Sequence, residues 1–291
     1  GDMTTEATVA NGLERIRYVE GIAYPSGIQL ELTSYCNAVC FFCAHTWSQR
    51  PQQHMDPALF RKAVDEVRGW PVPLGVLYLT GLGEPMMHPY WRELYTYAQG
   101  LPAAFTTNCS ILKHDDIELL MSLDFYEIAL SLDTLNPERH QKIRGFGVDR
   151  VAPKIRRVLE IARAREMNPR LIVSTTLTYE TLHDMADIYE WLVPQIDGIP
   201  NARWYIKQIG HFPDVKAPVQ IMPPMTFVKE LNDLLPAHPQ VSVIQDEDSL
   251  RPYCTLWFDR ATVLSDGSFV PCCHQAHDRH NVGNLATSTL V

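Results

Sequence analysis

Positive charge is scarce in this chain. Its 291 residues contain 25 Lys and Arg against 34 Asp and Glu, which gives a formal net charge of −9. The basic residues form no run or stripe along the sequence. Because nucleic-acid-binding surfaces neutralise phosphates with clustered Lys and Arg, the composition argues against a nucleic-acid partner.

Long apolar runs are absent as well. No stretch approaches the roughly 20 apolar residues that a membrane-spanning helix needs. Residues 1–10 have neither the basic nor the apolar region of a signal peptide. We therefore expect no membrane partner and a cytoplasmic location.

Cysteines are few and unevenly spread. The chain has seven, an odd number that does not suit a disulfide framework. They form two clusters and one isolated residue: Cys36, Cys40 and Cys43; Cys254, Cys272 and Cys273; and Cys109. Because clustered cysteines in a reducing cytosol more often hold a metal, both clusters are candidate metal sites.

What the sequence does contain is a regular alternation of strand and helix patterns. The expected strands are 28–33, 75–80, 103–107, 126–132, 171–178 and 203–209. The expected helices are 57–67, 89–99, 114–122, 151–165 and 182–192. This alternation predicts an α/β fold with a parallel sheet and right-handed crossovers. Six strands are too few for a closed eight-stranded barrel, so we expect an open, partial (β/α)6 barrel.

The expected barrel occupies residues 28–212, after an N-terminal extension at 1–27. A proline-rich stretch and a helix at 225–235 follow, so that residues 213–240 connect the barrel to a smaller C-terminal region at 241–291. In that region, residues 263–270 predict a β-hairpin around an Asp-Gly turn.

Polar motifs follow the expected strands at their C-terminal ends, where the chemistry of such barrels takes place. They comprise the first cysteine cluster, Gly81-Leu82-Gly83-Glu84-Pro85, Thr107-Asn108-Cys109 and Ser131-Leu132-Asp133. The motifs therefore converge on one end of the sheet.

The first cysteine cluster has a spacing of three residues and then two. Three thiolates on a loop can bind three corners of a cubane iron–sulfur cluster, which leaves the fourth iron open to a chelating molecule. Two alternatives are a zinc site that adds His45 to the three cysteines and unrelated structural thiols.

The aromatic Phe42 just before the third cysteine adds a family resemblance. The sequence resembles the radical S-adenosylmethionine (radical SAM) superfamily, whose signature is CxxxCxxC with an aromatic at this position. This resemblance implies a [4Fe-4S] cluster with an open iron site, held by Cys36, Cys40 and Cys43, and SAM as the molecule that chelates it.

The glycine-rich motif after the second strand supports the same resemblance. Glycines let a backbone approach a ligand closely, and a carboxylate can accept hydrogen bonds from an ammonium group; a plain turn is the alternative. In the radical SAM family this position carries the GGEP motif, which binds the amino group of SAM. Here Leu82 interrupts the motif, so that Gly81 precedes the matching residues Gly83, Glu84 and Pro85.

Four further residues are candidates with less specific support. The resemblance implies that Ser131 and Asp133 contact the carboxylate or ribose of SAM, with a strand cap as the alternative. Arg144 suits the SAM carboxylate or an anionic substrate, with an exposed arginine at a turn as the alternative. Lys207, beside Gln208 on the sixth strand, is a candidate substrate-binding or catalytic residue because a buried lysine needs a partner.

The second cysteine cluster resembles the SPASM/twitch region of many radical SAM enzymes, which binds an auxiliary iron–sulfur cluster. The resemblance implies a second cluster on Cys254, Cys272 and Cys273, although the downstream CxxC pair of that region does not occur before Val291. Either the sequence continues beyond Val291, or the cluster uses other ligands, for which Cys273, His274, His277 and His280 are the candidates. A zinc site and a region without metal are the alternatives.

The resemblance implies a radical SAM oxidoreductase that receives an electron from a reductant such as flavodoxin or ferredoxin. It would cleave SAM to a 5′-deoxyadenosyl radical, abstract a hydrogen atom from a substrate C–H bond and oxidise the substrate radical through the auxiliary cluster. A redox-neutral epimerase with Cys109 as hydrogen donor is one alternative, although a lone cysteine more often fills space. A zinc-binding interaction protein without catalysis is another.

We expect a small sugar-, cyclitol- or natural-product-like substrate, because few residues precede the first strand, although a peptide is possible. Trp47, Trp204 and Tyr205 could face such a ring, but aromatic residues are more often core.

Overall fold

A computed structural model describes residues 16–165, 169–208, 224–244, 260–271 and 281–291. The predictions made for Cys254, Cys272, Cys273 and the three neighbouring histidines lie outside these residues. The other candidate residues lie within them.

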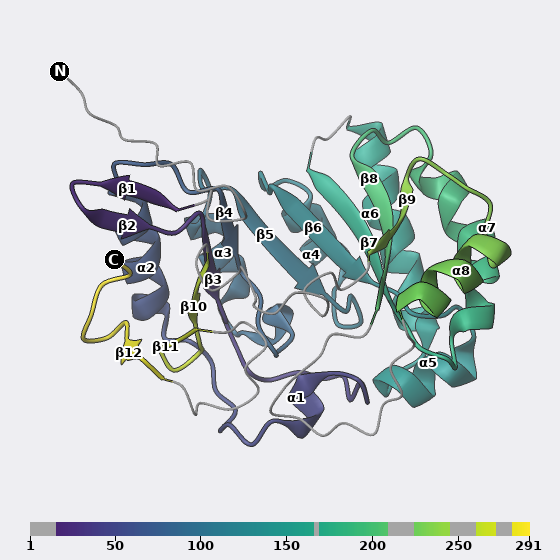
Figure 1. Ribbon diagram of the computed structural model, residues 1–291, viewed down its shortest axis with the longest axis horizontal. Helices are drawn as coiled ribbons and strands as arrows, with labels where there is room; N and C mark the ends of the chain where they lie inside the picture. Colours follow the sequence, from purple (N-terminus) through teal and green to yellow (C-terminus); the bar gives the residue numbers. More distant parts are fainter. Residues whose placement is uncertain (1–15, 166–168, 209–223, 245–259, 272–280) are drawn as a thin grey trace.

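One ten-stranded sheet organises the molecule, with the strand order β12-β11-β10-β3-β4-β5-β6-β7-β8-β9 (Figure 1). All neighbours from β10 to β9 are parallel, and β11 and β12 continue the β10 edge in antiparallel pairing. The strands are β3 (Gly27–Leu30), β4 (Val76–Tyr78), β5 (Ala103–Thr107), β6 (Glu127–Ser131), β7 (Arg170–Leu177), β8 (Ala202–Gln208), β9 (Val241–Ile244), β10 (Arg260–Val263), β11 (Ser268–Val270) and β12 (Gly283–Asn284).

The expected α/β fold with an open, partial barrel is confirmed, and its six strands are β3 to β8. The expected number of parallel strands was too small, because β9 and β10 join the sheet at its two edges. Strand β10 pairs in parallel with β3, from Arg260 opposite Gly27 to Val263 opposite Leu30. Since a bare strand edge leaves N–H and C=O groups unpaired, later segments cover both edges of the barrel.

The predicted hairpin around Asp266 and Gly267 is confirmed by the antiparallel pairing of β10 with β11. Its first strand belongs to the same sheet as the barrel. The division of the chain into a barrel and a separate C-terminal region stays a prediction, but the two share a continuous hydrogen-bonded sheet.

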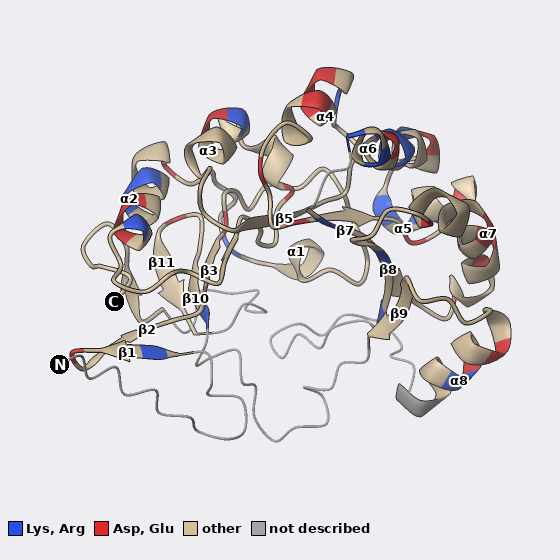
Figure 2. Ribbon diagram, turned by 90° about the horizontal axis from the view of Figure 1, so that it is seen from above, with Lys and Arg blue, Asp and Glu red and all other residues tan. Residues whose placement is uncertain are grey.

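The helices pack mainly on the outer face of the curved sheet. Figure 2 shows α2, α3, α4 and α6 in an arc outside it, whereas α1 lies on the inner side. The helices are α1 (Ala44–Trp47), α2 (Pro57–Arg68), α3 (Trp91–Tyr97), α4 (His114–Leu120), α5 (Pro137–Arg144), α6 (Ala152–Ala164), α7 (Met185–Ile196) and α8 (Pro224–Leu234), with short 3₁₀ turns η1 (Pro85–Met87), η2 (Val148–Arg150) and η3 (Leu182–Asp184).

Local sequence explains where α2 begins and ends. The Asp56 carboxylate caps it by accepting from the Ala58 N–H over 2.7 Å, and Pro57 occupies the first turn. Phe60 and Val64 face the core, and the helix ends at Gly69. The helix predicted at residues 57–67 is therefore confirmed.

Several short elements, α1 and β12 among them, were not predicted from the sequence. A hairpin of β1 (Arg17–Val19) and β2 (Ile22–Tyr24) lies within the expected N-terminal extension. Helix α5 has Ile143 as its main apolar residue, so it shows no helical hydrophobic pattern; the Asn136 cap and Gly145, with φ of +86°, define its ends instead.

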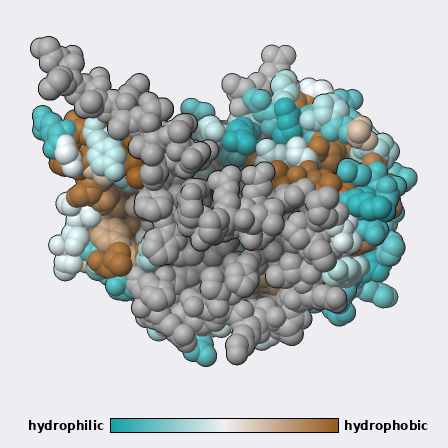
Figure 3. All heavy atoms as spheres, viewed as in Figure 1, coloured by the Kyte–Doolittle hydropathy of each residue, from teal (hydrophilic) through white to brown (hydrophobic). Residues whose placement is uncertain are grey.

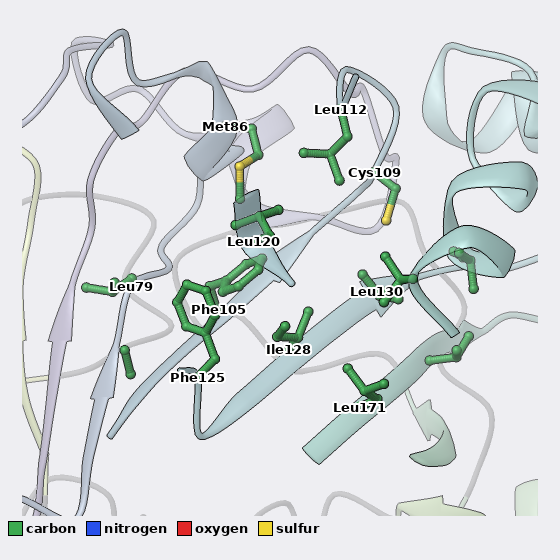
Figure 4. Packing of buried hydrophobic residues seen from close by; sticks show 14 of the residues in the cluster. Leu79, Met86, Phe105, Cys109, Leu112, Leu120, Phe125, Ile128, Leu130 and Leu171 are labelled. Carbon is green, nitrogen blue, oxygen red and sulfur yellow. The ribbon is translucent and has the colours of Figure 1, made fainter. Parts of the chain in front are cut away.

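The core fills the space between sheet and helices. Figure 4 shows Phe105 and Phe125 packed together, with ring centroids 4.8 Å apart, near Leu79 and Ile128. Because side chains alternate along a strand, the residues between these core positions face the inner side of the sheet.

Apolar atoms also reach the surface at one end of the molecule, over β1, β2 and β12 in Figure 3. Ile22 is 45% exposed there and Val282 is 74% exposed. None of the described helices is both long and apolar enough to cross a membrane.

Candidate functional site

The first three cysteines lie on one loop between β3 and α1. Cys36 and Cys43 are half-buried, and Cys40 is buried. The Cys43 N–H donates to the Cys40 carbonyl over 3.0 Å, and the Thr46 hydroxyl donates to the same oxygen over 2.8 Å. The loop is therefore folded back on itself around the Cys40 carbonyl.

Burial favours the protonated form of these thiols. It raises the pKa of Cys36 to about 12 and that of Cys40 to about 11, and it also raises the pKa of Cys43. Charges on Cys40 and Cys43 add to the rise at Cys36, so the three thiolates would repel one another. An iron centre would displace the protons and neutralise that repulsion, which is a chemical fit to the predicted cluster.

No group of three or more Cys, His, Asp or Glu side chains in the described part of the chain stands at metal-ligand spacing. His45, the fourth ligand of the zinc alternative, has its Nε2 atom 3.0 Å from the Ser34 carbonyl oxygen. That contact holds the ring against the backbone and favours three protein ligands over four. Phe42 packs against the core beside Phe41, with ring centroids 5.4 Å apart.

Glu84 is a buried carboxylate without an ion-pair partner among the described residues. One oxygen accepts from the Thr107 hydroxyl over 2.7 Å and from the Met86 N–H over 3.3 Å, and the other accepts from the Asn108 N–H over 2.7 Å. Burial raises the pKa of Glu84 despite these donors. A cationic ligand would compensate this desolvation, so Glu84 suits an ammonium group.

Gly81 and Gly83 occupy positions where neighbouring protein atoms leave no room for a Cβ atom. A Cβ atom on Gly83 would lie 2.2 Å from the Thr33 carbonyl oxygen, and one on Gly81 would lie 2.3 Å from the Glu31 Cγ atom. The sequence reading assigned these glycines to close approach of a ligand. In the structure they allow the Glu84 loop to approach the segment between β3 and the cysteines, and Pro85 then begins η1.

We expect Gly83→Ala to lower the free energy of unfolding by about 1–3 kcal/mol, since its Cβ meets backbone that cannot rotate away. The matched control is Gly27→Ala on β3, whose Cβ would meet Val76 Cγ1 at 3.4 Å, an ordinary contact. Urea denaturation of both variants measures the difference. Equal stability of the two would contradict the packing argument.

The sequence reading missed Glu31, which joins four segments of the site. Its carboxylate accepts two hydrogen bonds from Arg50, over 2.9 and 2.7 Å, and further bonds from the Leu82 N–H and the Ser265 hydroxyl. Glu31 is 1% exposed. Glu31 thus ties the segment after α1, the Glu84 loop and the C-terminal hairpin to the end of β3. The only sequence signal was an acidic residue at a polar position of an alternating strand.

Arg144 lies beside the cysteine loop, and its carbonyl accepts from the Val39 N–H over 3.1 Å. The expected alternative of an exposed arginine is wrong, since Arg144 is 6% exposed. Its guanidinium donates to Asp133 over 2.7 Å, and the other Asp133 oxygen accepts from the Thr176 N–H over 2.9 Å. Burial opposes the charge on Arg144, but Asp133, Cys40 and Cys43 together outweigh burial and raise the pKa of Arg144 above its usual range.

Asp133 is fully buried. Its contact with the guanidinium holds the Arg144 side chain in place. The Ser131 side chain is half-buried on the inner face, and its hydroxyl has no hydrogen-bond partner among the described residues. Of the two residues predicted from this strand, Ser131 is therefore the better placed to contact a ligand directly.

Cys109 is surrounded by protein. It is 1% exposed, and Figure 4 shows its sulfur near Leu112 and Leu130. Its φ of +63° lies in the left-handed region that favours glycine, and burial raises the pKa of its thiol to about 12. A hydrogen donor must reach the substrate radical, so this placement favours a packing role.

Of the three aromatic residues expected near the mouth of the barrel, Trp204 is fully buried and donates to the Thr175 hydroxyl over 2.9 Å. Tyr205 and Lys207 alternate with the core residues of β8 and therefore face the inner side of the sheet. Trp47, on α1, is 37% exposed. Trp204 is thus a core residue, and Lys207 is placed where a ligand could reach it.

Comparison with known proteins matches residues 30–192 to the family model described as "Radical SAM superfamily". The "Tungsten-containing aldehyde ferredoxin oxidoreductase cofactor-modifying protein" of Pyrococcus furiosus is 25% identical over 170 residues, which are 57% of this chain and 48% of that protein. The "AdoMet-dependent heme synthase" of Methanosarcina barkeri is 30% identical over 125 residues, 42% of this chain and 35% of the other. The chain thus spans at most about half of these curated relatives.

Solved structures share the fold at low sequence identity. Streptococcus suis SuiB bound to precursor peptide SuiA has a TM-score of 0.73 at 15% identity, and the match covers 92% of this chain and 64% of SuiB. The structure titled "Native anSMEcpe with bound AdoMet" has a TM-score of 0.62 at 17% identity, covering 90% of this chain and 78% of the other.

Proposed function

Because the chain belongs to the radical SAM superfamily, we propose that it reductively cleaves SAM and that the 5′-deoxyadenosyl radical then takes a hydrogen atom from a substrate C–H bond. The observation that supports this reaction most directly is the pairing of the cysteine loop with Glu84. The Glu84 N–H donates to the carbonyl of Tyr35, the residue before Cys36, over 2.8 Å. The loop with the three cysteines and a buried carboxylate that has no ion-pair partner among the described residues are thus adjacent.

Cys36, Cys40 and Cys43 would hold a [4Fe-4S] cluster whose fourth iron binds SAM. When bound, the cluster supplies the electron that cleaves the sulfonium of SAM. The chain's own residues bind and orient SAM: Glu84 accepts from its ammonium group, and Ser131 and Arg144 face its carboxylate. Asp133 holds the Arg144 guanidinium in place, so the ion pair preorganises the site.

For the later steps we propose net oxidation of the substrate. The C–H hydrogen would leave as part of 5′-deoxyadenosine, and an auxiliary iron–sulfur cluster would supply the acceptor for the one electron that the substrate loses together with a proton. Cys254, Cys272 and Cys273, outside the described residues, would hold that cluster. The order of the chain supports this placement, because β10 and β11 attach the C-terminal segment to β3, the strand that leads into the cysteine loop.

The names of the relatives indicate more substrate classes than the small molecules expected from the sequence. One is a cofactor-modifying protein, one a heme synthase and one, of Mycobacterium tuberculosis, a "Mycofactocin maturase" that is 27% identical over 134 residues. SuiB was solved with a precursor peptide. We therefore propose a cofactor precursor or natural product, including one derived from a peptide, with flavodoxin or ferredoxin as reductant.

The test is anaerobic reconstitution with iron and sulfide, followed by reduction with dithionite and measurement of 5′-deoxyadenosine. Glu84→Gln should weaken SAM binding by about 10- to 150-fold, since a hydrogen bond to a charged group contributes about 1.5–3 kcal/mol. Glu93→Gln, on the exposed face of α3, is the matched control and should bind SAM normally. A wild-type protein that binds iron fully but forms no 5′-deoxyadenosine would refute the proposal.

A further inference from the structure

The inner face of β7 and β8 carries polar groups for which the described residues provide no partners. The side chains of Ser174 and Thr176 on β7 and Lys207 on β8 are half-buried there. Ser174 and Thr176 alternate with the core residues Val173 and Leu177, which fixes their direction. Among the described residues, none provides a hydrogen-bond partner for the Ser174 or Thr176 hydroxyl or for the Lys207 ammonium.

The register of the sheet brings these groups together. Thr176 lies directly opposite Lys207, and Ser174 lies opposite Tyr205 on the same face. Neighbouring strands are about 4.8 Å apart, so one small group can contact the Lys207 ammonium and a hydroxyl from β7 together. Two hydroxyl donors and one ammonium form a set suited to an oxyanion.

The charges around Lys207 also favour an anion. The carboxylate that acts on it is Glu127 of β6, which is already paired with Arg170 at 3.4 Å. Asp133, whose oxygen accepts from the Thr176 N–H, is paired with Arg144. Each described carboxylate near this face therefore has its own cation, and Lys207 remains in excess. Burial lowers the pKa of Lys207, and Glu127 only partly opposes this shift.

We propose that the inner face of β7 and β8 is a substrate subsite that binds a carboxylate group, with Lys207 as its ion partner and Ser174 and Thr176 as hydrogen-bond donors. The placement of this subsite beside SAM rests on the proposed function, since Ser131 faces SAM in that proposal and pairs with Ser174 across the strands. The substrate is then an acid, anchored by its carboxylate on β7 and β8 while a nearby C–H bond faces SAM.

The experiment uses the full chain labelled with [13Cε]lysine, in which seven lysines give seven signals. Lys207→Met assigns the Lys207 signal, and Lys207→Arg, which keeps the charge, provides a second assignment should the methionine variant not fold. The probes are propionate and its neutral counterpart propionamide. Propionate should shift the Lys207 signal saturably and raise the pKa of Lys207, whereas propionamide should shift neither.

Lys229, which is exposed on α8 and paired with Asp233, is the internal control for nonspecific anion effects. A linear shift, an equal shift with propionamide or an equal shift at Lys229 would overturn the proposal. Two capped tripeptides, Gly-Asp-Gly and Gly-Asn-Gly, then distinguish the source of the carboxylate. A shift with the aspartyl peptide assigns the subsite to peptide acids as well, and a shift with propionate alone assigns it to small free acids.

The 5′-deoxyadenosine assay distinguishes a failure of the subsite proposal from a failure of the proposed function. SAM cleavage without a propionate response would remove the carboxylate subsite and leave the radical chemistry in place. A propionate response without SAM cleavage would leave an acid-binding site in a protein that does not perform the proposed reaction.

Discussion

Replacing Cys36, Cys40 and Cys43 together by alanine is expected to reduce 5′-deoxyadenosine formation to the level of a reaction without protein. No other described cysteine lies on that loop, and Cys109 is enclosed in the core. The loop itself is held by backbone contacts of Cys40 and Val39, so the variant should fold. Circular dichroism and thermal unfolding check the fold, and liquid chromatography measures the product.

Iron counting on the same variant tests the auxiliary cluster. Retention of about four irons per chain would place a second cluster in the C-terminal segment and support the oxidative outcome. Complete loss of iron would mean that this segment holds zinc or no metal, and redox-neutral chemistry would then be favoured. Cys109→Ala is the matched thiol control: it should keep its iron, and a loss of turnover in this variant would revive the epimerase hypothesis.

Arg144→Met is expected to destabilise the protein by about 3–5 kcal/mol, because it leaves the fully buried Asp133 carboxylate without its cation. The effect should appear in denaturant unfolding of the metal-free protein, before any question of SAM binding arises. Because the Arg144 carbonyl also accepts from the Val39 N–H, a shift of α5 would disturb the cysteine loop too.

The double variant Asp133→Leu/Arg144→Met isolates the pair. Replacing both members of a buried ion pair by apolar residues is often close to neutral, so the double variant should recover most of the lost stability. Lys229→Ala, in an exposed pair with Asp233, should change stability very little. A double variant as unstable as Arg144→Met would show that the loss arises from packing around the arginine and not from the unpaired carboxylate.

The family motifs and the repeated strand–helix units could be identified from local patterns in the sequence alone. Strands β3 to β8 were predictable because each is a short apolar run or a short alternation of apolar and polar residues, and α2 because its cap and apolar spacing are both local. The three cysteines, Phe42 and the Gly83-Glu84-Pro85 motif could be recognised for the same reason, since each is a contiguous motif.

Tertiary structure alone decided how segments far apart in the chain meet. Strand β10 covers β3, which is more than two hundred residues earlier, and Glu31 receives hydrogen bonds from Arg50, Leu82 and Ser265. The burial of Arg144, the enclosure of Cys109 and the half-buried position of Lys207 on the inner face likewise depend on neighbours in other elements. Propensity and periodicity describe residues within one element, whereas pairing, burial and charge balance arise between elements, so no local pattern specifies them.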